Sequence, residues 1–109
     1  MGTRELSIYS KKEMKIFVDI DGTICTNTNG DYINAKPIRK NIDKINKLFE
    51  AGHDITYWTA RGGNTGKDWS ELTMQQLRDW GCKFCRLDTK TKPAWDLLID
   101  DKTKRIEEI

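Results

Sequence analysis

The residues KIFVDIDGT, at positions 15–23, decide the fold that this sequence predicts. Segment 15–21 is short, apolar and rich in β-branched residues, which indicates a strand buried on both faces. Gly22 ends this strand and lets the chain turn tightly next to a ligand. Two carboxylates, Asp19 and Asp21, therefore stand at the end of a buried strand.

Apolar residues at helical and strand spacing alternate along the rest of the chain. Further strands are expected over residues 54–59, 83–87 and 97–99, with two helices between them that end at Gly52 and Gly81. The apolar stripes are Ile38, Ile42, Ile45, Leu48 and Phe49 on the first helix, and Trp69, Leu72, Leu77 and Trp80 on the second, which Asp68 caps. Strands that alternate with helices predict an α/β domain with a mostly parallel sheet.

The domain boundaries follow from the same pattern. Residues 1–13 show weak periodicity and are interpreted as an N-terminal extension or tag, so the folded domain is expected to span residues 14–109. Between the first strand and the first helix, the turn signal Asn29-Gly30-Asp31 predicts a small hairpin flap over residues 26–35.

Length and composition indicate one globular domain. The chain has 109 residues, of which 33% are charged and 37% hydrophobic, and a typical domain has about 100–150 residues. The net charge of +2 and the pI of about 8.4 do not favour nucleic acid as a partner, since nucleic-acid-binding domains usually have a pI above about 9 and clustered basic residues. Acids and amides interrupt the basic run between Lys36 and Lys47, which favours a solvated helix face.

The sequence also bears on the cellular compartment. No apolar stretch approaches the roughly 20 residues that a membrane span needs, and residues 1–13 lack the apolar segment of a signal peptide. We therefore expect no membrane partner and a cytoplasmic location. The three cysteines, an odd number, fit a reducing compartment better than a disulfide framework.

Asp19 and Asp21 form the first part of a candidate site. Residues i and i+2 of a strand point the same way, so the two carboxylates lie side by side. Like charges this close raise each other's pKa unless a cation neutralises them, and Mg2+ binds such oxygen ligands. Asp100 and Asp101 follow the last strand and would bring four carboxylates to neighbouring strand ends. The structural alternative is that each acidic pair only caps a turn.

Groups that suit a phosphate occur at two further strand ends. Thr59, Ala60 and Arg61 close the second strand; a hydroxyl can donate to a phosphate oxygen, and an arginine can pair with phosphate as a fork. Lys92 lies just before Pro93 and the last short helix, from where its amine could reach the strand ends and neutralise both Asp19 and a phosphate, with Lys90 as an alternative. The alternatives are a threonine that ends a strand, a solvated arginine and a surface lysine. Ligands bind beyond the carboxyl ends of parallel strands, where these groups are expected.

Taken in order, DxDGT after the first strand, a threonine after the second, a lysine before the last helix and an Asp-Asp pair after the last strand resemble the haloacid-dehalogenase-like phosphohydrolase superfamily. The resemblance covers about residues 14–102. It implies a three-layer Rossmann-like core and a phosphatase that requires Mg2+ and forms an aspartyl-phosphate.

The resemblance also implies a role for each matching residue. Asp19 would be the nucleophile, and Asp21 the general acid and then the general base. Thr59 would hold the transferring group, and Lys92 would orient the nucleophile. The residues expected to bind phosphate are Gly22, Thr59, Ala60, Arg61 and Lys92. The residues expected to bind Mg2+ are Asp19, Asp21 (through its main-chain carbonyl), Asp100 and Asp101.

The spacing leaves no room for the cap domain that larger members of this superfamily carry. The segment from Thr23 to Pro37 is short, and one helix and one strand fill residues 59–92. The chain is therefore similar to the capless branch, whose members often act on large substrates or oligomerise, so a homo-oligomer stays open. A small phosphorylated metabolite or sugar is the favoured substrate. Nucleic-acid ends, a protein substrate and a non-catalytic phosphate-binding or phospho-accepting module are the alternatives.

Other polar and aromatic residues point to structural roles. Cys82 and Cys85 have CxxC spacing but lack two further suitably spaced zinc ligands, so core or half-buried thiols are expected. His53 lies between a helix cap and a strand and is expected at the surface. Trp69 and Trp80 are expected in the core.

Overall fold

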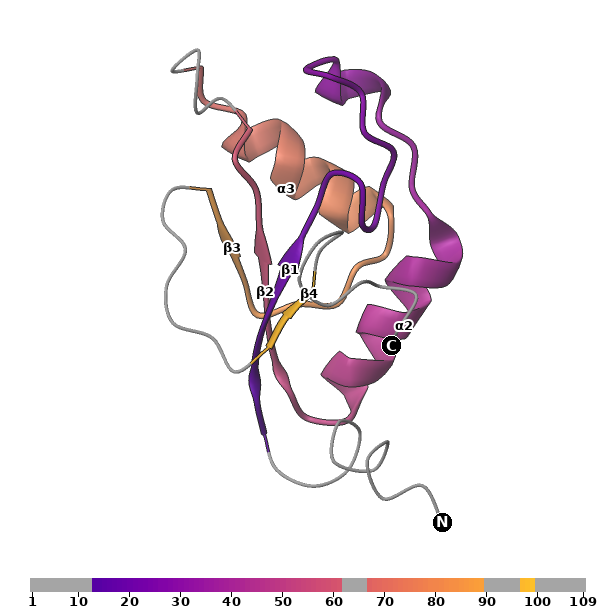
Figure 1. Ribbon diagram of the computed structural model, residues 1–109, viewed down its shortest axis with the longest axis vertical. Coiled ribbons are helices and arrows are strands. Elements are labelled where there is room, and N and C mark those ends of the chain that lie inside the picture. The colour runs from indigo at the N-terminus through magenta and orange to yellow at the C-terminus, as the bar shows by residue number, and fades with distance from the viewer. Residues whose placement is uncertain (1–12, 62–66, 90–96, 100–109) are drawn as a thin grey trace.

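The structure is a computed structural model that describes residues 13–61, 67–89 and 97–99. These residues form an α/β domain, as predicted, with a parallel sheet in the order β3-β2-β1-β4 (Figure 1). The strands are β1 (Lys15–Asp19), β2 (Asp54–Trp58), β3 (Arg86–Asp88) and β4 (Leu97–Ile99). Helix α2 (Arg39–Glu50) connects β1 to β2, helix α3 (Ser70–Asp79) lies between β2 and β3, and the 3-10 turn η1 (Tyr32–Asn34) precedes α2.

Both α-helices pack on the same face of the sheet. The chain moves from β1 to β2 to β3 in one direction, and right-handed crossovers then put both helices on one side. Alternate side chains of the strands face the helices in one fully buried cluster, which includes Ile16, Val18, Ile55 and Tyr57 from the strands, Ile42, Ile45 and Leu48 from α2, and Leu77 from α3. A third layer on the opposite face stays a prediction.

Helix α2 forms as its spacing predicts. Ile42, Ile45 and Leu48 are fully buried, and Gly52 stops the helix with a φ of 100°. The amide of Gly52 donates to the Phe49 carbonyl at 3.0 Å, and the next amide donates to the Leu48 carbonyl at 3.2 Å. These two bonds make a Schellman cap. Neither α2 nor α3, the two α-helices of the described ranges, is long and apolar enough to cross a membrane.

Helix α3 buries two polar residues beside part of the predicted stripe, in which Leu77 is buried and Trp80 packs against the core. Thr73, Gln76 and Leu77 are buried, whereas Trp69 is half-buried and only precedes the helix. The expectation of Trp69 in the core is therefore wrong. The reason is that two polar side chains of α3 turn inward to bind a buried arginine, Arg61.

Three strand boundaries differ from the prediction. β2 ends at Trp58, one residue before its predicted end. β1 ends at Asp19 because the Ile20 carbonyl accepts the amides of Thr23 and Ile24, at 3.1 and 3.0 Å, and so starts a turn. β3 covers Arg86–Asp88 rather than residues 83–87. The two cysteines of the CxxC spacing thus precede the strand, one half-buried and one exposed.

The expectation of a surface position for His53 is wrong. Its side chain is 4% exposed, and Nδ1 accepts a hydrogen bond from the Met14 amide at 3.1 Å. This bond ties the entry of β1 to the entry of β2. Burial lowers the pKa of the His53 imidazole, and the charge of Glu13 opposes that shift.

The flap is a closed loop rather than a two-stranded hairpin. Cys25 and Pro37 form an isolated antiparallel bridge at its neck, and the Thr26 amide donates to the Lys36 carbonyl at 2.9 Å. The predicted Asn29-Gly30 turn is present, with φ values of 55° and 101°. A 3-10 turn follows it in place of a returning strand. In the described stretch between β1 and α2 there is accordingly no cap domain.

Candidate functional site

The carboxyl ends of the parallel strands all lie at the same end of the sheet. The order of the strands reverses between β1 and β4, which makes this position a topological switch point. From β1 the chain proceeds to β2 and β3, whereas β4 lies on the other side of β1. Ligands of open α/β sheets bind at such a switch point, outside the carboxyl ends of the strands. Asp19 is the last residue of β1, and its neighbour Val18 pairs with Ile99, the last residue of β4.

Three predicted site residues lie outside the described ranges, namely Lys92, Asp100 and Asp101. Their roles stay predictions. Asp100 and Asp101 follow Ile99 directly in the sequence, and the carboxyl end of β4 lies beside that of β1.

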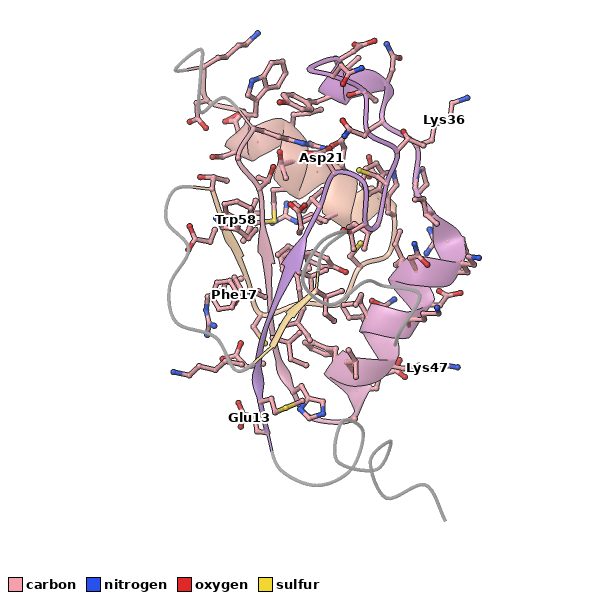
Figure 2. The ribbon with its side chains drawn as sticks, in the orientation of Figure 1. Glu13, Phe17, Asp21, Lys36, Lys47 and Trp58 are labelled. Atoms are coloured by element: carbon pink, nitrogen blue, oxygen red, sulfur yellow. The ribbon has the colours of Figure 1, made fainter. Side chains whose placement is uncertain are left out.

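A tight turn after β1 holds the two described carboxylates. Oδ1 of Asp19 accepts the Ile20 amide at 3.0 Å. Gly22 has a φ of 86°, and its amide donates to the Cys25 carbonyl at 2.9 Å. An L side chain is strained at this φ, so the backbone explains the glycine. Figure 2 shows Asp21 near the flap and α3, at the end of the sheet opposite Glu13.

Thr59 follows β2 and brings a buried hydroxyl to Asp21. Its Oγ1 lies 3.4 Å from Oδ2 of Asp21, to which it donates, and it accepts the Arg61 amide at 3.1 Å. Thr59 is 1% exposed, and the next residue, Ala60, is exposed. For Thr59 to hold a phosphoryl group, the hydroxyl proton has to turn from Asp21 toward that group.

Arg61 is buried, so the alternative of a solvated arginine is wrong. Its Nε donates to Oδ2 of Asp21 at 3.0 Å, and its Nη2 donates to Oδ1 at 2.8 Å. Its Nη1 donates to the Thr73 hydroxyl at 3.1 Å and to Oε1 of Gln76 at 2.6 Å. All three guanidinium nitrogens therefore bind protein side chains, and a fork onto phosphate would require Arg61 to leave Asp21.

The flap is attached to this network through Tyr32. Cζ of Arg61 lies 4.7 Å from the centre of the Tyr32 ring, which is cation–π distance. Nε2 of Gln76 donates to the Tyr32 carbonyl at 2.7 Å, and the Tyr32 and Trp69 rings meet edge to face at 5.1 Å. Arg61 and Gln76 thus connect the turn after β1, the flap and α3.

Cys25 is buried beside Asp21, and its thiol is unreactive. Its Sγ donates to the Ile20 carbonyl at 3.7 Å and to Oδ1 of Asp21 at 3.6 Å. Burial, followed by the negative charge of Asp21, raises the pKa of Cys25 to about 12, although Arg61 opposes the shift. A thiol with this pKa is protonated at neutral pH and is a poor nucleophile.

The chemistry of the described donors suits a hard cation. The carboxylate oxygens of Asp19 and the main-chain carbonyl oxygen of Asp21 are ligands of the kind that Mg2+ prefers. Among the described residues, no group of three or more histidine, cysteine or acidic side chains could hold a metal ion by itself. A complete magnesium site needs a further oxygen ligand, and the residues after β4 are the candidates.

Sequence reasoning expected Tyr32 near the site, in the flap, but missed three other residues of this network: Cys25, Thr73 and Gln76. One signal could have revealed two of them. Thr73 and Gln76 are three residues apart and share a helix face with the buried Leu77. A polar pair on an inward face requires a buried polar partner, which here is Arg61.

The comparisons with known proteins add evidence on the fold. No family model and no curated protein matches the sequence. The chain is similar to the crystal structure of an MCSG target from Vibrio cholerae, with a TM-score of 0.65 and 24% sequence identity. The match covers 87% of this chain and 86% of that one. It shows a shared Rossmann-like α/β fold along most of the chain.

Proposed function

We propose that this protein is a magnesium-dependent phosphomonoester hydrolase that works through an aspartyl-phosphate on Asp19. The observation that carries the proposal is the position of Asp19 and Asp21. They end β1 and begin the following turn at the switch point of the sheet, and the Thr59 hydroxyl lies 3.4 Å from Asp21. The DxDGT motif and the order of the polar groups in the sequence support the same activity.

In the first step, a carboxylate oxygen of Asp19 attacks the phosphorus atom and the bond to the leaving oxygen breaks. Asp21, which has to take up a proton from solvent before this step, gives that proton to the leaving oxygen, so the alcohol departs neutral and Asp21 returns to the anionic form that pairs with Arg61. A water molecule then attacks the phosphorus of the acyl phosphate, and Asp21 accepts the proton of the water. Inorganic phosphate leaves, and the Asp19 carboxylate is restored.

The protein residues supply position and charge to both steps. Phosphoryl transfer depends mainly on in-line geometry and on neutralising the equatorial oxygens. Mg2+ would supply positive charge, held by Asp19, by the carbonyl of Asp21 and by Asp100 or Asp101. In this proposal Thr59, Gly22 and Ala60 contact the phosphoryl oxygens, and Lys92 orients the nucleophile.

The favoured substrate is a small phosphorylated metabolite or sugar in the cytoplasm. In the described stretch between β1 and α2, the flap is the element nearest the site, and it contacts Arg61 and Gln76 through Tyr32. A phosphate at a nucleic-acid end, a phosphoprotein and assembly into a homo-oligomer are the alternatives for substrate and partner.

The test is p-nitrophenyl phosphate hydrolysis by the full chain, with Mg2+ and with EDTA, followed by a screen of phosphorylated sugars and metabolites ranked by kcat/KM. Activity should require Mg2+ and should fall by at least about 1,000-fold in Asp19→Asn, since the nucleophile is lost. Asp43→Asn on the exposed face of α2 is the matched control and should retain activity. Activity that persists in Asp19→Asn, or in EDTA, would contradict the mechanism.

A further inference from the structure

The bonds of Arg61 suit a fixed support better than a phosphate ligand. The Arg61 side chain is 1% exposed, and the Asp21 carboxylate, 20% exposed, is its anionic partner at 2.8 Å. A buried guanidinium has to keep its acceptors, because burying a charged group with unpaired donors is strongly unfavourable. Moving Arg61 toward a ligand would break bonds to three other side chains.

The geometry of the contact defines what Arg61 does to Asp21. Nε and Nη2 approach the two carboxylate oxygens as a fork, at 3.0 and 2.8 Å. Paired parallel bonds fix the plane of a carboxylate as well as its position. A lysine, with a single ammonium, cannot fix both. Thr59 adds a third contact at 3.4 Å, so the Asp21 carboxyl is oriented from two sides.

The third guanidinium nitrogen of Arg61, Nη1, is also fixed by hydrogen bonds. Gln76 accepts from Nη1 at 2.6 Å and donates to the Tyr32 carbonyl at 2.7 Å. Thr73 accepts from the same nitrogen at 3.1 Å. The ring of Tyr32 covers Cζ at 4.7 Å. The orientation of Asp21 is therefore connected to α3 and to the flap through one side chain.

We propose that Arg61 is a positioning residue that orients the carboxyl group of Asp21 for proton transfer, and that it does not bind the substrate phosphate. This inference rests on the proposed function, in which Asp21 protonates the leaving oxygen. General acid catalysis matters most when the leaving group is a poor one. A nitrophenolate departs without a proton, whereas an alkoxide does not.

The test compares two substrates in the full chain with saturating Mg2+. One is p-nitrophenyl phosphate and the other is glycerol phosphate, and kcat/KM is measured because it reports the steps up to the phosphoryl-enzyme. The variants are Arg61→Lys, which keeps the charge and loses the fork, and Arg61→Met, which loses both. Arg86→Lys and Arg86→Met are the controls, since Arg86 binds Asp54 at 2.9 Å from an exposed position at the start of β3.

We expect the Arg61 variants to lose at least about 10-fold more activity on glycerol phosphate than on p-nitrophenyl phosphate, because general acid catalysis contributes about 100-fold or more. Arg86 variants should keep the wild-type ratio. Equal losses on both substrates would overturn the inference, since lost structure alone lowers both equally. A rise in KM common to both substrates, with kcat unchanged, would also overturn it and would make Arg61 a phosphate ligand.

A failure of the proposed function gives a different experimental result from a failure of this inference. A wild-type protein without magnesium-dependent activity on either substrate would overturn that function, and this inference with it. If Arg61→Met does not fold, as judged by its thermal unfolding, the ratio in Arg61→Lys decides the question.

Discussion

The ion pair between Asp21 and Arg61 should contribute to stability as well as to activity, and Asp21→Asn tests this. The chain offers a matched pair for comparison. Arg61 approaches Asp21 at 2.8 Å and Arg86 approaches Asp54 at 2.9 Å. The two carboxylates are similarly exposed, at 20% and 16%, but the arginine side chains are 1% and 59% exposed. The burial of the arginine is the main difference between the two pairs.

The size of the effect follows from that burial. Removing one partner of a buried ion pair costs about 3–5 kcal/mol, because the remaining charge is left uncompensated. Asparagine keeps one oxygen that can accept from Arg61, and water reaches part of Asp21, so we expect a loss of about 2 kcal/mol for Asp21→Asn. The Asp54→Asn change should cost less than about 1 kcal/mol, since surface pairs contribute little.

The assay is urea and thermal unfolding followed by circular dichroism, without Mg2+. A loss of about 2 kcal/mol lowers the Tm of a domain of this size by roughly 10 °C, and it leaves Asp21→Asn folded, because domains typically have about 5–15 kcal/mol of stability. Equal losses in Asp21→Asn and Asp54→Asn would refute the reasoning, since they would show that the charge of Arg61 is as well solvated as an exposed one.

Three further predictions concern other parts of the fold. Burial lowers the pKa of His53 from its ordinary value of 6.5, so the unfolded state binds more protons near this pH; the free energy of unfolding should fall as the pH drops below about 6.5, and His53→Gln should weaken that dependence. Burial raises the pKa of Cys25 to about 12 and that of Cys82 to about 11, whereas Cys85 is exposed; one thiol should react quickly with Ellman's reagent in the native protein and three after denaturation. Gly52 has a φ of 100°, so Gly52→Ala should cost about 1 kcal/mol in urea unfolding, and no loss would contradict the strained φ.

Local patterns predicted the elements whose burial is purely apolar. The strand that begins at Lys15 and the stripe of Ile42, Ile45 and Leu48 form where their spacing indicates. In each of them the hydrophobic period and the tertiary environment agree, so the pattern alone is sufficient. Gly22 and Gly52 also have the positive φ that their positions require.

The predictions that differ from the structure depend on long-range polar pairing, which local patterns do not carry. Thr73 and Gln76 are buried because Arg61, more than ten residues away, needs acceptors there. The flap ends in a 3-10 turn because Tyr32 packs on Arg61 and Trp69. His53 is buried because the Met14 amide binds its Nδ1. Tertiary contacts of this kind override local propensity.

In the candidate site, too, the local motif predicted some residues correctly, and the role of another depends on long-range pairing. The motif placed Asp19, Asp21 and Thr59 at the carboxyl edge of the sheet, and the structure brings Asp21 and Thr59 into contact. The sequence could not assign the partner of Arg61, because a fork onto phosphate and a fork onto a carboxylate need the same side chain. The roles of Lys92, Asp100 and Asp101 stay predictions.

The most direct measurement of the central claim is the identification of the phosphorylated residue. Asp21→Asn protein is incubated with Mg2+ and p-nitrophenyl phosphate, whose leaving group needs no proton, then quenched in acid, digested and analysed by mass spectrometry. The account predicts one phosphoryl group on Asp19, which hydroxylamine removes as it does any acyl phosphate. A phosphoryl group on another side chain, or a folded Asp21→Asn protein that takes up none while the wild type turns over the same substrate, would contradict it.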